Sequence, residues 1–386
     1  MRDVAAAFGA AGLACALILA VPARAELAVS GNDGKATLEN GVQVVPKEVV
    51  PDSVTIIDMS ASPPKVVAEI EAPASVVGPP LSVAVAPDES IALVTSAQTL
   101  DPADKTKYAA DDQLSVVDLK ASPPRVVATH RVGKGAAGVS INRAGTLAIV
   151  ANRNEGTVSV FTIRNGTLAG GEKIRLGDEK SGPSAVAFTR DGTAAYVTRD
   201  GDYRISVLSI DGDKVEYAKR DLYAGLRPYG LDITGSGEVG IVANIGLGAG
   251  DADTISLIDL KAKPSRVTST ITVGQTPEGL KMSPDGQFVA VGVINGSNKA
   301  KTSPFFNDHG LLKVYRIDGG QMRPVAEAKI GHWCQGIVWS RDGRRILTQC
   351  MIERELLAFS FDGKTLQPTG SIKLKAGPAG IRTAEP

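Results

Sequence analysis

The stretch Gly182-Pro-Ser-Ala-Val-Ala-Phe-Thr-Arg-Asp-Gly192 decides the fold, because close copies of it recur along the chain. Its alternating run predicts a β-strand, and the Asp-Gly pair that follows predicts a tight turn. A repeat spaced at 44 to 57 residues is typical of the four-stranded blades of a β-propeller. The equivalent small residues of the seven copies are Ser82, Gly138, Ala185, Gly230, Gly279, Gly336 and Gly380.

The two ends of the chain predict how the blades close into a ring. The last copy, from Gly377, has room for only a first strand, whereas strands near residues 26–29, 54–58 and 66–70 precede the first copy. Pairing these segments in one sheet gives six whole blades and a shared seventh, and removes exposed sheet edges. We therefore predict an all-β, seven-bladed propeller over residues 26–386, whose seventh blade combines N- and C-terminal strands.

Two segments resemble a known family: Ala148-Ile-Val-Ala-Asn-Arg-Asn-Glu-Gly-Thr-Val-Ser-Val-Phe161 and Ala194-Ala-Tyr-Val-Thr-Arg-Asp-Gly-Asp-Tyr-Arg-Ile-Ser-Val207. They are similar to the YVTN family of β-propeller repeats, and the likeness extends over nearly all of residues 26–386. Such propellers are similar to lactonases, electron-transfer subunits, surface-layer proteins and binding modules alike. The resemblance therefore implies the fold and leaves the activity open.

Residues 1–25 have the features of a secretory signal peptide, with Arg2 near the start, an apolar run over residues 13–21 and Ala23-Arg-Ala25 at the end. A short membrane anchor is the alternative. The signal predicts a periplasmic or secreted protein with no membrane segment after cleavage. Export favours a disulfide between Cys334 and Cys350. In a hairpin that turns at residues 340–343, with facing residue numbers summing to 684, these two cysteines oppose each other.

Composition and motifs exclude several classes of function. Forty-two basic residues balance 42 acidic ones, so no overall field favours nucleic acid or an anionic membrane. The chain has no phosphate loop, dinucleotide fingerprint or haem attachment motif, and its three histidines do not suit a multi-histidine metal centre. We expect no cofactor and no metal. The expected partner is a small molecule or another exported protein.

The residue before each small residue of the repeat occupies one slot at the channel entrance. Three consecutive blades place large polar residues there, and the other four place small or apolar ones. Long segments at 31–52, 97–112, 245–253 and 295–310 surround the same face. The sequence predicts a half-polar ligand pocket there, and a water-filled channel with satisfied polar groups is the alternative. The predicted binding residues are Ser184, Arg227, Tyr229, Glu278, His332, Trp333 and Gln335.

The leading functional hypothesis is an exported propeller that binds its ligand at this face without chemistry of its own. The alternative is a lactonase-like hydrolase, in which Glu278 and His332 serve as base or acid while Arg227 and Tyr229 stabilise negative charge. The pairing of Arg with His after Gly-Pro, which is associated with YVTN-type lactonases, is absent here. An accessory subunit of an exported redox enzyme is a third possibility.

Overall fold

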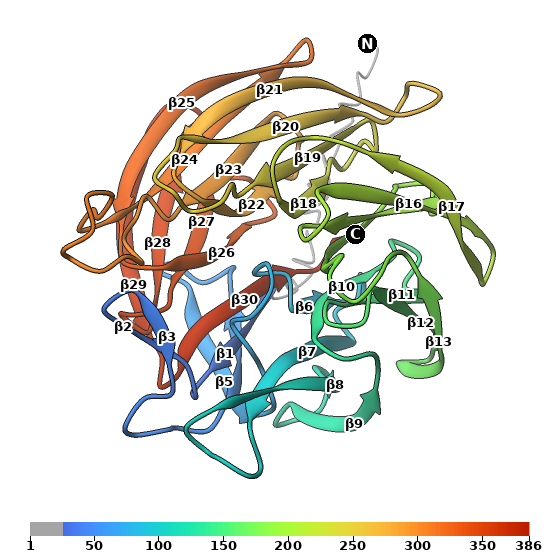
Figure 1. The fold of residues 1–386 in the computed structure, drawn as a ribbon, viewed down its shortest axis with the longest axis horizontal. Helices are drawn as coiled ribbons and strands as arrows, with labels where there is room; N and C mark the ends of the chain where they lie inside the picture. Colours follow the sequence, from blue (N-terminus) through green and yellow to red (C-terminus); the bar gives the residue numbers. More distant parts are fainter. Residues whose placement is uncertain (1–25, 386) are drawn as a thin grey trace, which may run out of the picture.

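Each copy of the repeat folds into one four-stranded antiparallel sheet in the computed structural model, which describes residues 26–385. The sheets are blades arranged around a central axis (Figure 1). Blade 1 contains β6 (Val83–Val85), β7 (Ile91–Leu100), β8 (Tyr108–Asp118) and β9 (Arg125–Arg131). Blade 2 contains β10 (Ala136–Ile141), β11 (Leu147–Asn152), β12 (Thr157–Arg164) and β13 (Thr167–Arg175). Blade 3 contains β14 (Pro183–Phe188), β15 (Ala194–Arg199), β16 (Arg204–Asp211) and β17 (Lys214–Leu222).

The next three blades repeat this order. Blade 4 contains β18 (Pro228–Ile233), β19 (Val239–Asn244), β20 (Asp253–Asp259) and β21 (Arg266–Gly274). Blade 5 contains β22 (Pro277–Met282), β23 (Phe288–Val293), β24 (Gly310–Asp318) and β25 (Gln321–Ile330). Blade 6 contains β26 (Cys334–Trp339), β27 (Arg345–Cys350), β28 (Glu355–Phe361) and β29 (Leu366–Lys373).

The seventh blade joins the two ends of the described chain, as predicted. Its order is β30 (Gly377–Thr383), β1 (Leu27–Asp33), β4 (Ser53–Asp58) and β5 (Lys65–Glu71). Ile381 lies opposite Ser30, and Gly31 lies opposite Val54, so the closing strand forms the innermost position of this sheet. Figure 1 shows β30 in red directly beside β1 in blue. The predicted all-β, seven-bladed architecture and its closure are confirmed.

Apolar packing between neighbouring blades forms the core. Seven buried clusters each join two adjacent blades, and together they run once around the ring. The two middle strands of a blade are covered on both faces, as β11 shows with six buried residues in succession. The outermost strand alternates instead, as in β9, because one of its faces meets solvent. None of the described residues belongs to a helix that could cross a membrane.

Two of the long segments predicted as loops contain regular structure. Residues 31–52 carry a small hairpin of β2 (Thr37–Glu39) and β3 (Val42–Val44), and residues 97–112 include the extended ends of β7 and β8. The segments at 245–253 and 295–310 are built largely of turns and unpaired chain. The two meet where the ring of Phe305 packs on the backbone at Gly250. This contact ties the insertions of blades 4 and 5 together.

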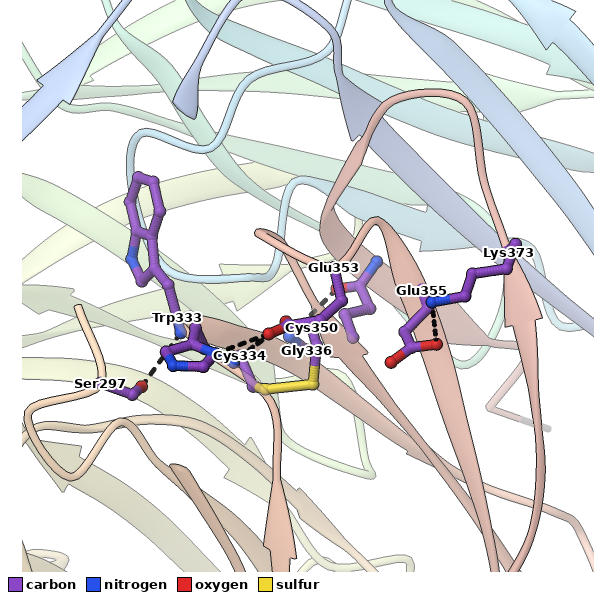
Figure 2. The surroundings of a disulfide bond; sticks show 10 residues. Ser297, Trp333, Cys334, Gly336, Cys350, Glu353, Glu355 and Lys373 are labelled. Carbon is purple, nitrogen blue, oxygen red and sulfur yellow. Dashed lines mark hydrogen bonds and ion pairs between the residues drawn. A yellow bond between two sulfur atoms is a disulfide. The ribbon is translucent and has the colours of Figure 1, made fainter. Parts of the chain in front are cut away.

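The predicted disulfide joins Cys334 to Cys350, which face each other across β26 and β27 (Figure 2). The register is the predicted one at the cysteines, but nearer the turn Trp339 faces Ile346, one residue away from the predicted sum. A β-bulge between Cys334 and Ile337 makes up the difference. Both cysteines are buried, at 1% and 0% exposure.

Candidate functional site at the channel mouth

The slot residues of six blades lie at β-bulges. In β14, for example, Pro183 faces Arg199 and Val186 faces Val197, so Ser184 and Ala185 together oppose one residue. The same irregularity occurs in β10, β18, β22, β26 and β30. A bulge turns side chains away from the regular alternation and is common beside functional sites. The predicted slot is therefore a bulge position in every blade except the first.

Blade 1 fills part of the channel instead of contributing a bulge. The connection from β5 to β6 is buried at Pro79, Pro80 and Leu81. Pro80 lies so close to blade 5 that a Cβ added to Gly279 would be 3.4 Å from its Cγ. Leu81 belongs to the apolar cluster between blades 3 and 4. This connection therefore reaches across the axis from blade 1 and fills the channel as far as blades 3, 4 and 5.

The polar side of the channel mouth is organised around one carboxylate, Asp200, which follows β15. Arg153 forms a bidentate ion pair with it, and one of the two hydrogen bonds, from Nη2 to Oδ2, is 2.8 Å long. The Ser184 hydroxyl donates to Asp200 Oδ1 at 2.6 Å, and Arg227 Nη2 lies 3.0 Å from Oδ2. Two guanidinium groups therefore share one carboxylate that is only 2% exposed.

Tyr229 and Glu278 lie beside these charges. The guanidinium carbon of Arg153 is 5.7 Å from the centroid of the Tyr229 ring, a cation–π distance. Tyr229 is 7% exposed and Glu278 is 8% exposed. We call the seven residues around this point the mouth cluster. They are Arg153, Ser184, Asp200, Arg227, Tyr229, Glu278 and Gln335.

The two carboxyl groups of the mouth cluster titrate in opposite directions. Burial alone would raise the pKa of Asp200, but its contacts with Arg153, Ser184 and Arg227 outweigh burial and hold the pKa below its ordinary value. Burial raises the pKa of Glu278 to about 8, because Arg227 and Arg153 offset only part of the desolvation. At neutral pH the cluster therefore contains two cations, one carboxylate and one protonated acid that can donate a hydrogen bond.

Gln335 leaves two polar atoms of the mouth cluster unsatisfied. Its side chain is fully buried, and neither its amide nitrogen nor its oxygen has a hydrogen-bond partner among residues 26–385. The amide lies near enough to Glu278 to lower the pKa of that carboxyl slightly, although the pair does not meet hydrogen-bond geometry. An unpaired buried amide is costly unless water or a ligand satisfies it.

The residue two positions before the slot distinguishes the blades further. Blades 2 and 3 place glycine there with a left-handed backbone, at φ values of 71° for Gly135 and 62° for Gly182. Blades 4, 5 and 6 hold Arg227, Thr276 and Trp333 in the same conformation, at 56°, 55° and 46°. Side chains rarely adopt this backbone, and such strain concentrates at functional sites. The three strained positions precede the three large polar slot residues.

The structure places His332 and Trp333 away from the mouth cluster. Trp333 packs with Ala36, Val76 and Ala379, on the apolar side of the ring. His332 Nδ1 lies 2.6 Å from Glu353 Oε1, and its imidazole lines a groove of about 600 Å³ between the β2–β3 hairpin and residues 297–306. Figure 2 shows Trp333 and Glu353 beside the disulfide, which fixes the two segments that carry His332 and Glu353.

Two members of the mouth cluster, Arg153 and Asp200, were not among the residues predicted from the sequence. Both follow a second strand in a short loop, directly after Asn152 and Arg199. The sequence signal was a charged residue at the same place in neighbouring repeats, on the face where the long loops gather. Five of the seven predicted binding residues, Ser184, Arg227, Tyr229, Glu278 and Gln335, do lie together. Their role in binding stays a prediction.

Among residues 26–385, no three histidine, cysteine or acidic side chains are grouped in a way that could hold a metal ion. The charged atoms of the mouth cluster are instead guanidinium groups paired with one carboxylate. Guanidinium forks match the geometry of carboxylates and phosphates. The site therefore presents two guanidinium groups, one carboxylate and one neutral acid that can donate a hydrogen bond.

Comparisons with known proteins extend this picture of the fold. No protein-family model matches the sequence, and a search of curated proteins finds no match. Among solved structures, a putative 6-phosphogluconolactonase from Bacteroides uniformis is 16% identical with a TM-score of 0.71, and the match covers 93% of this chain and 99% of that one. The periplasmic gluconolactonase of Pseudomonas aeruginosa is 17% identical with a TM-score of 0.68, over 93% and 99%.

Structures with other functions match as well. The hydrazine synthase of Kuenenia stuttgartiensis is 17% identical with a TM-score of 0.57, over 76% of this chain and 79% of that one. At such identities the likeness shows the fold alone. The protein is a seven-bladed β-propeller similar in architecture to lactonase-like propellers.

Proposed function

We propose that this protein binds a small organic anion at the channel mouth, without chemistry of its own. The observation that carries the proposal is the charge arrangement of the mouth cluster. Arg153 and Arg227 share the carboxylate of Asp200, and a protonated Glu278 lies beside them. A carboxylate ligand would accept hydrogen bonds from both guanidinium groups, and Gln335 would gain partners for its amide.

The ligand class we favour is a sugar acid. The polar atoms of several blades converge at one point of the channel mouth, which suits a small molecule better than a large partner protein. The ligand needs hydroxyl groups as well as a negative charge, because the Gln335 amide offers both a hydrogen-bond donor and an acceptor. Two structural neighbours are described as a gluconolactonase and a putative 6-phosphogluconolactonase, which makes D-gluconate a reasonable first probe.

Export is part of the same proposal. The buried disulfide agrees with an exported protein. The predicted signal peptide, residues 1–25, lies outside the described residues, and the periplasmic or secreted location stays a prediction. Expression with residues 1–25 present and mass spectrometry of the recovered protein test it. Export predicts a chain that begins at Glu26 and contains no free thiol.

Calorimetric titration with D-gluconate tests binding. We expect the wild type to bind, and we expect Arg227→Gln to weaken binding about tenfold or more, because a charge-assisted hydrogen bond contributes roughly 1.5–3 kcal/mol. Arg164→Gln is the matched control, since Arg164 is 80% exposed on the outside of the ring. Equal affinity for wild type and Arg227→Gln, or no binding of gluconate by either, would reject the proposal. Capture of an exported protein by the same face would favour a macromolecular partner.

A second candidate function, lactone hydrolysis, is favoured by the two lactonase-named neighbours and by the place of Glu278. Its raised pKa suits a general acid near neutral pH, and Arg227 and Arg153 stand ready to stabilise an oxyanion. Of the predicted catalytic residues Glu278, His332 and Arg227, His332 pairs with Glu353 and lines the separate groove. Any hydrolysis at the mouth would therefore proceed without that histidine.

The two candidates are separated by assaying D-glucono-1,5-lactone opening above the spontaneous rate. The binding proposal predicts no enzymatic acceleration by the wild type. Hydrolysis with Glu278 as acid predicts acceleration that is lost in Glu278→Gln, retained in His332→Gln, and reduced above about pH 8, where the wild-type carboxyl ionises. That pattern would replace the first candidate by the second.

A further inference from the structure

The opposite end of the channel contains a second charged recess, on the face where the first and second strands of each blade turn. It is a cavity of about 460 Å³ lined by Arg143, Lys281 and Glu385 among its charged residues, and by Ile233, Met282 and Trp339 among its apolar ones. None of these residues belongs to the mouth cluster. The cavity therefore lies outside the site of the proposed function.

Lys281 in this cavity has two carboxylate partners where one would suffice. Its Nζ lies 3.0 Å from Oδ1 of Asp232, a buried partner whose Oδ2 also accepts the Met282 N–H at 2.8 Å. The second partner is Glu385, which follows the closing strand β30. Asp232 is held by its own strand and by this backbone hydrogen bond, whereas Glu385 reaches the cavity from the end of the described chain.

Arg382 adds positive charge in a narrow space next to this recess. The residue is 8% exposed, and its Nη1 has no hydrogen-bond partner within the described part of the chain. It lines a narrow space of about 40 Å³ that shares Arg143, Asp232 and Glu385 with the larger cavity. A buried guanidinium N–H without an acceptor is unfavourable, and an anion in this space would supply one.

Glu385 occupies the recess as a ligand carboxylate would. Although it lies deep among the blades, 42% of its side-chain surface remains open, because it faces the cavity. Burial opposes ionisation of Glu385, but Lys281, Arg382 and Arg143 lower its pKa below the ordinary value, so the group is a carboxylate at neutral pH. Its side chain is accessible, charged and attached to only a short segment beyond β30.

We propose that this cavity is a binding site for a small organic carboxylate with an apolar body, and that Glu385 is its displaceable internal occupant. Lys281, Arg382 and Arg143 would hold the carboxylate of the ligand, while Ile233, Met282 and Trp339 would contact its body. An internal carboxylate competes with the external one, so the apparent affinity equals the intrinsic affinity multiplied by the fraction of time that the site is free. The proposal needs no bond to form or break.

Calorimetric titration of the full chain with phenylacetate tests the proposal, with phenylacetamide as the uncharged control ligand. We expect wild type to bind phenylacetate weakly and Glu385→Gln to bind it about tenfold more tightly, as for a site that the tail occupies nine-tenths of the time. Phenylacetamide is expected to bind neither protein. Asp213→Asn, at an acidic residue 58% exposed elsewhere, should behave as wild type.

A second variant separates this site from a purely structural ion pair. Adding Arg382→Gln to Glu385→Gln should remove the gain in affinity. If the variant with Arg382→Gln does not fold, Arg143→Gln takes its place, at a partly exposed turn residue, and should reduce the gain. Equal phenylacetate affinity of wild type and Glu385→Gln would overturn the proposal. So would binding of phenylacetamide, or binding of inorganic phosphate as tight as that of phenylacetate, because the site would then not select an organic carboxylate.

Discussion

The two halves of the channel mouth use equivalent positions of the repeat and have opposite chemistry. Blades 7, 1 and 2 place Ala379, Leu81 and Ala137 at the slot, and the connection into blade 1 fills the channel beside them. Blades 3 to 6 place Ser184, Tyr229, Glu278 and Gln335 there. The difference shows that equivalent positions of the repeat can have different roles: apolar residues on one side pack in the channel, and polar residues on the other side form a charged cluster.

The largest expected effect comes from Glu278, the protonated acid of the polar half. Its pKa is higher in the folded protein than in the unfolded chain, so it stabilises the fold fully below pH 4.5 and this stabilisation is lost as the pH rises through about 8. Glu278→Gln lacks this dependence. The free energy of unfolding of Glu278→Gln, minus that of wild type, should rise by roughly 1.4 kcal/mol per pH unit between pH 5 and 8.

Urea unfolding at several pH values measures this difference. Glu216→Gln, at a residue 61% exposed on an outer strand, is the control and should show no comparable slope. A flat difference for Glu278→Gln between pH 5 and 8 would mean that the carboxyl ionises normally, and the polar half would then lose its hydrogen-bond donor.

Leu81 tests the apolar half. It is 3% exposed and packs across the channel against blades 3 and 4, so Leu81→Ala should lower the free energy of unfolding by about 3 kcal/mol while leaving gluconate affinity unchanged. Leu247→Ala, at a residue 64% exposed, is the control and should have no measurable effect. Lost gluconate binding by a folded Leu81→Ala protein would contradict the division between the halves.

Among the described residues, only the polar half contains a disulfide cross-link. It closes a segment with a sequence separation of 16 residues, and replacing both Cys334 and Cys350 by Ala should lower the free energy of unfolding by about 2 to 3 kcal/mol. Denaturant unfolding of the oxidised wild type and the double variant gives the value. An equal midpoint for the two proteins would show that packing in blade 6 is sufficient without the bridge.

The smallest expected effect exchanges the backbone character of the two halves. Thr276 holds a left-handed backbone in blade 5, and Thr276→Gly should raise the free energy of unfolding by about 1 kcal/mol, because strain outweighs the added entropy of the unfolded chain. The reciprocal change in the apolar half, Gly135→Ala in blade 2, should lower it by at least as much. Thermal unfolding of both variants checks the pair, and a loss of stability in Thr276→Gly would contradict the strain assigned to the polar half.

The ring and its closure could be predicted because the repeat contains the information for both. Each copy contains a strand, a turn and a small residue at the same place, and the incomplete last copy supplies one strand of a blade that the N-terminal strands complete. The disulfide partners followed from the same hairpin, although the bulge that aligns Cys334 with Cys350 has no separate sequence signal.

The site was predicted less completely, for a reason that concerns side-chain direction. The slot residues were found because the repeat fixes their place, whereas Arg153 and Asp200 lie in loops whose approach to the axis depends on the whole ring. His332 and Trp333 were expected at the pocket because they precede the slot. In the structure Trp333 packs with Ala36 and Val76, and His332 pairs with Glu353, so neither side chain joins the mouth cluster. Such packing depends on tertiary contacts, which a sequence pattern does not contain.

A crystal structure of the protein soaked with D-gluconate tests the central claim most directly. We predict density for its carboxylate beside Arg153 and Arg227, with the hydroxyl groups reaching Gln335. An unoccupied mouth at a saturating concentration, or gluconate bound only in the groove at His332 or against Lys281, would contradict the account.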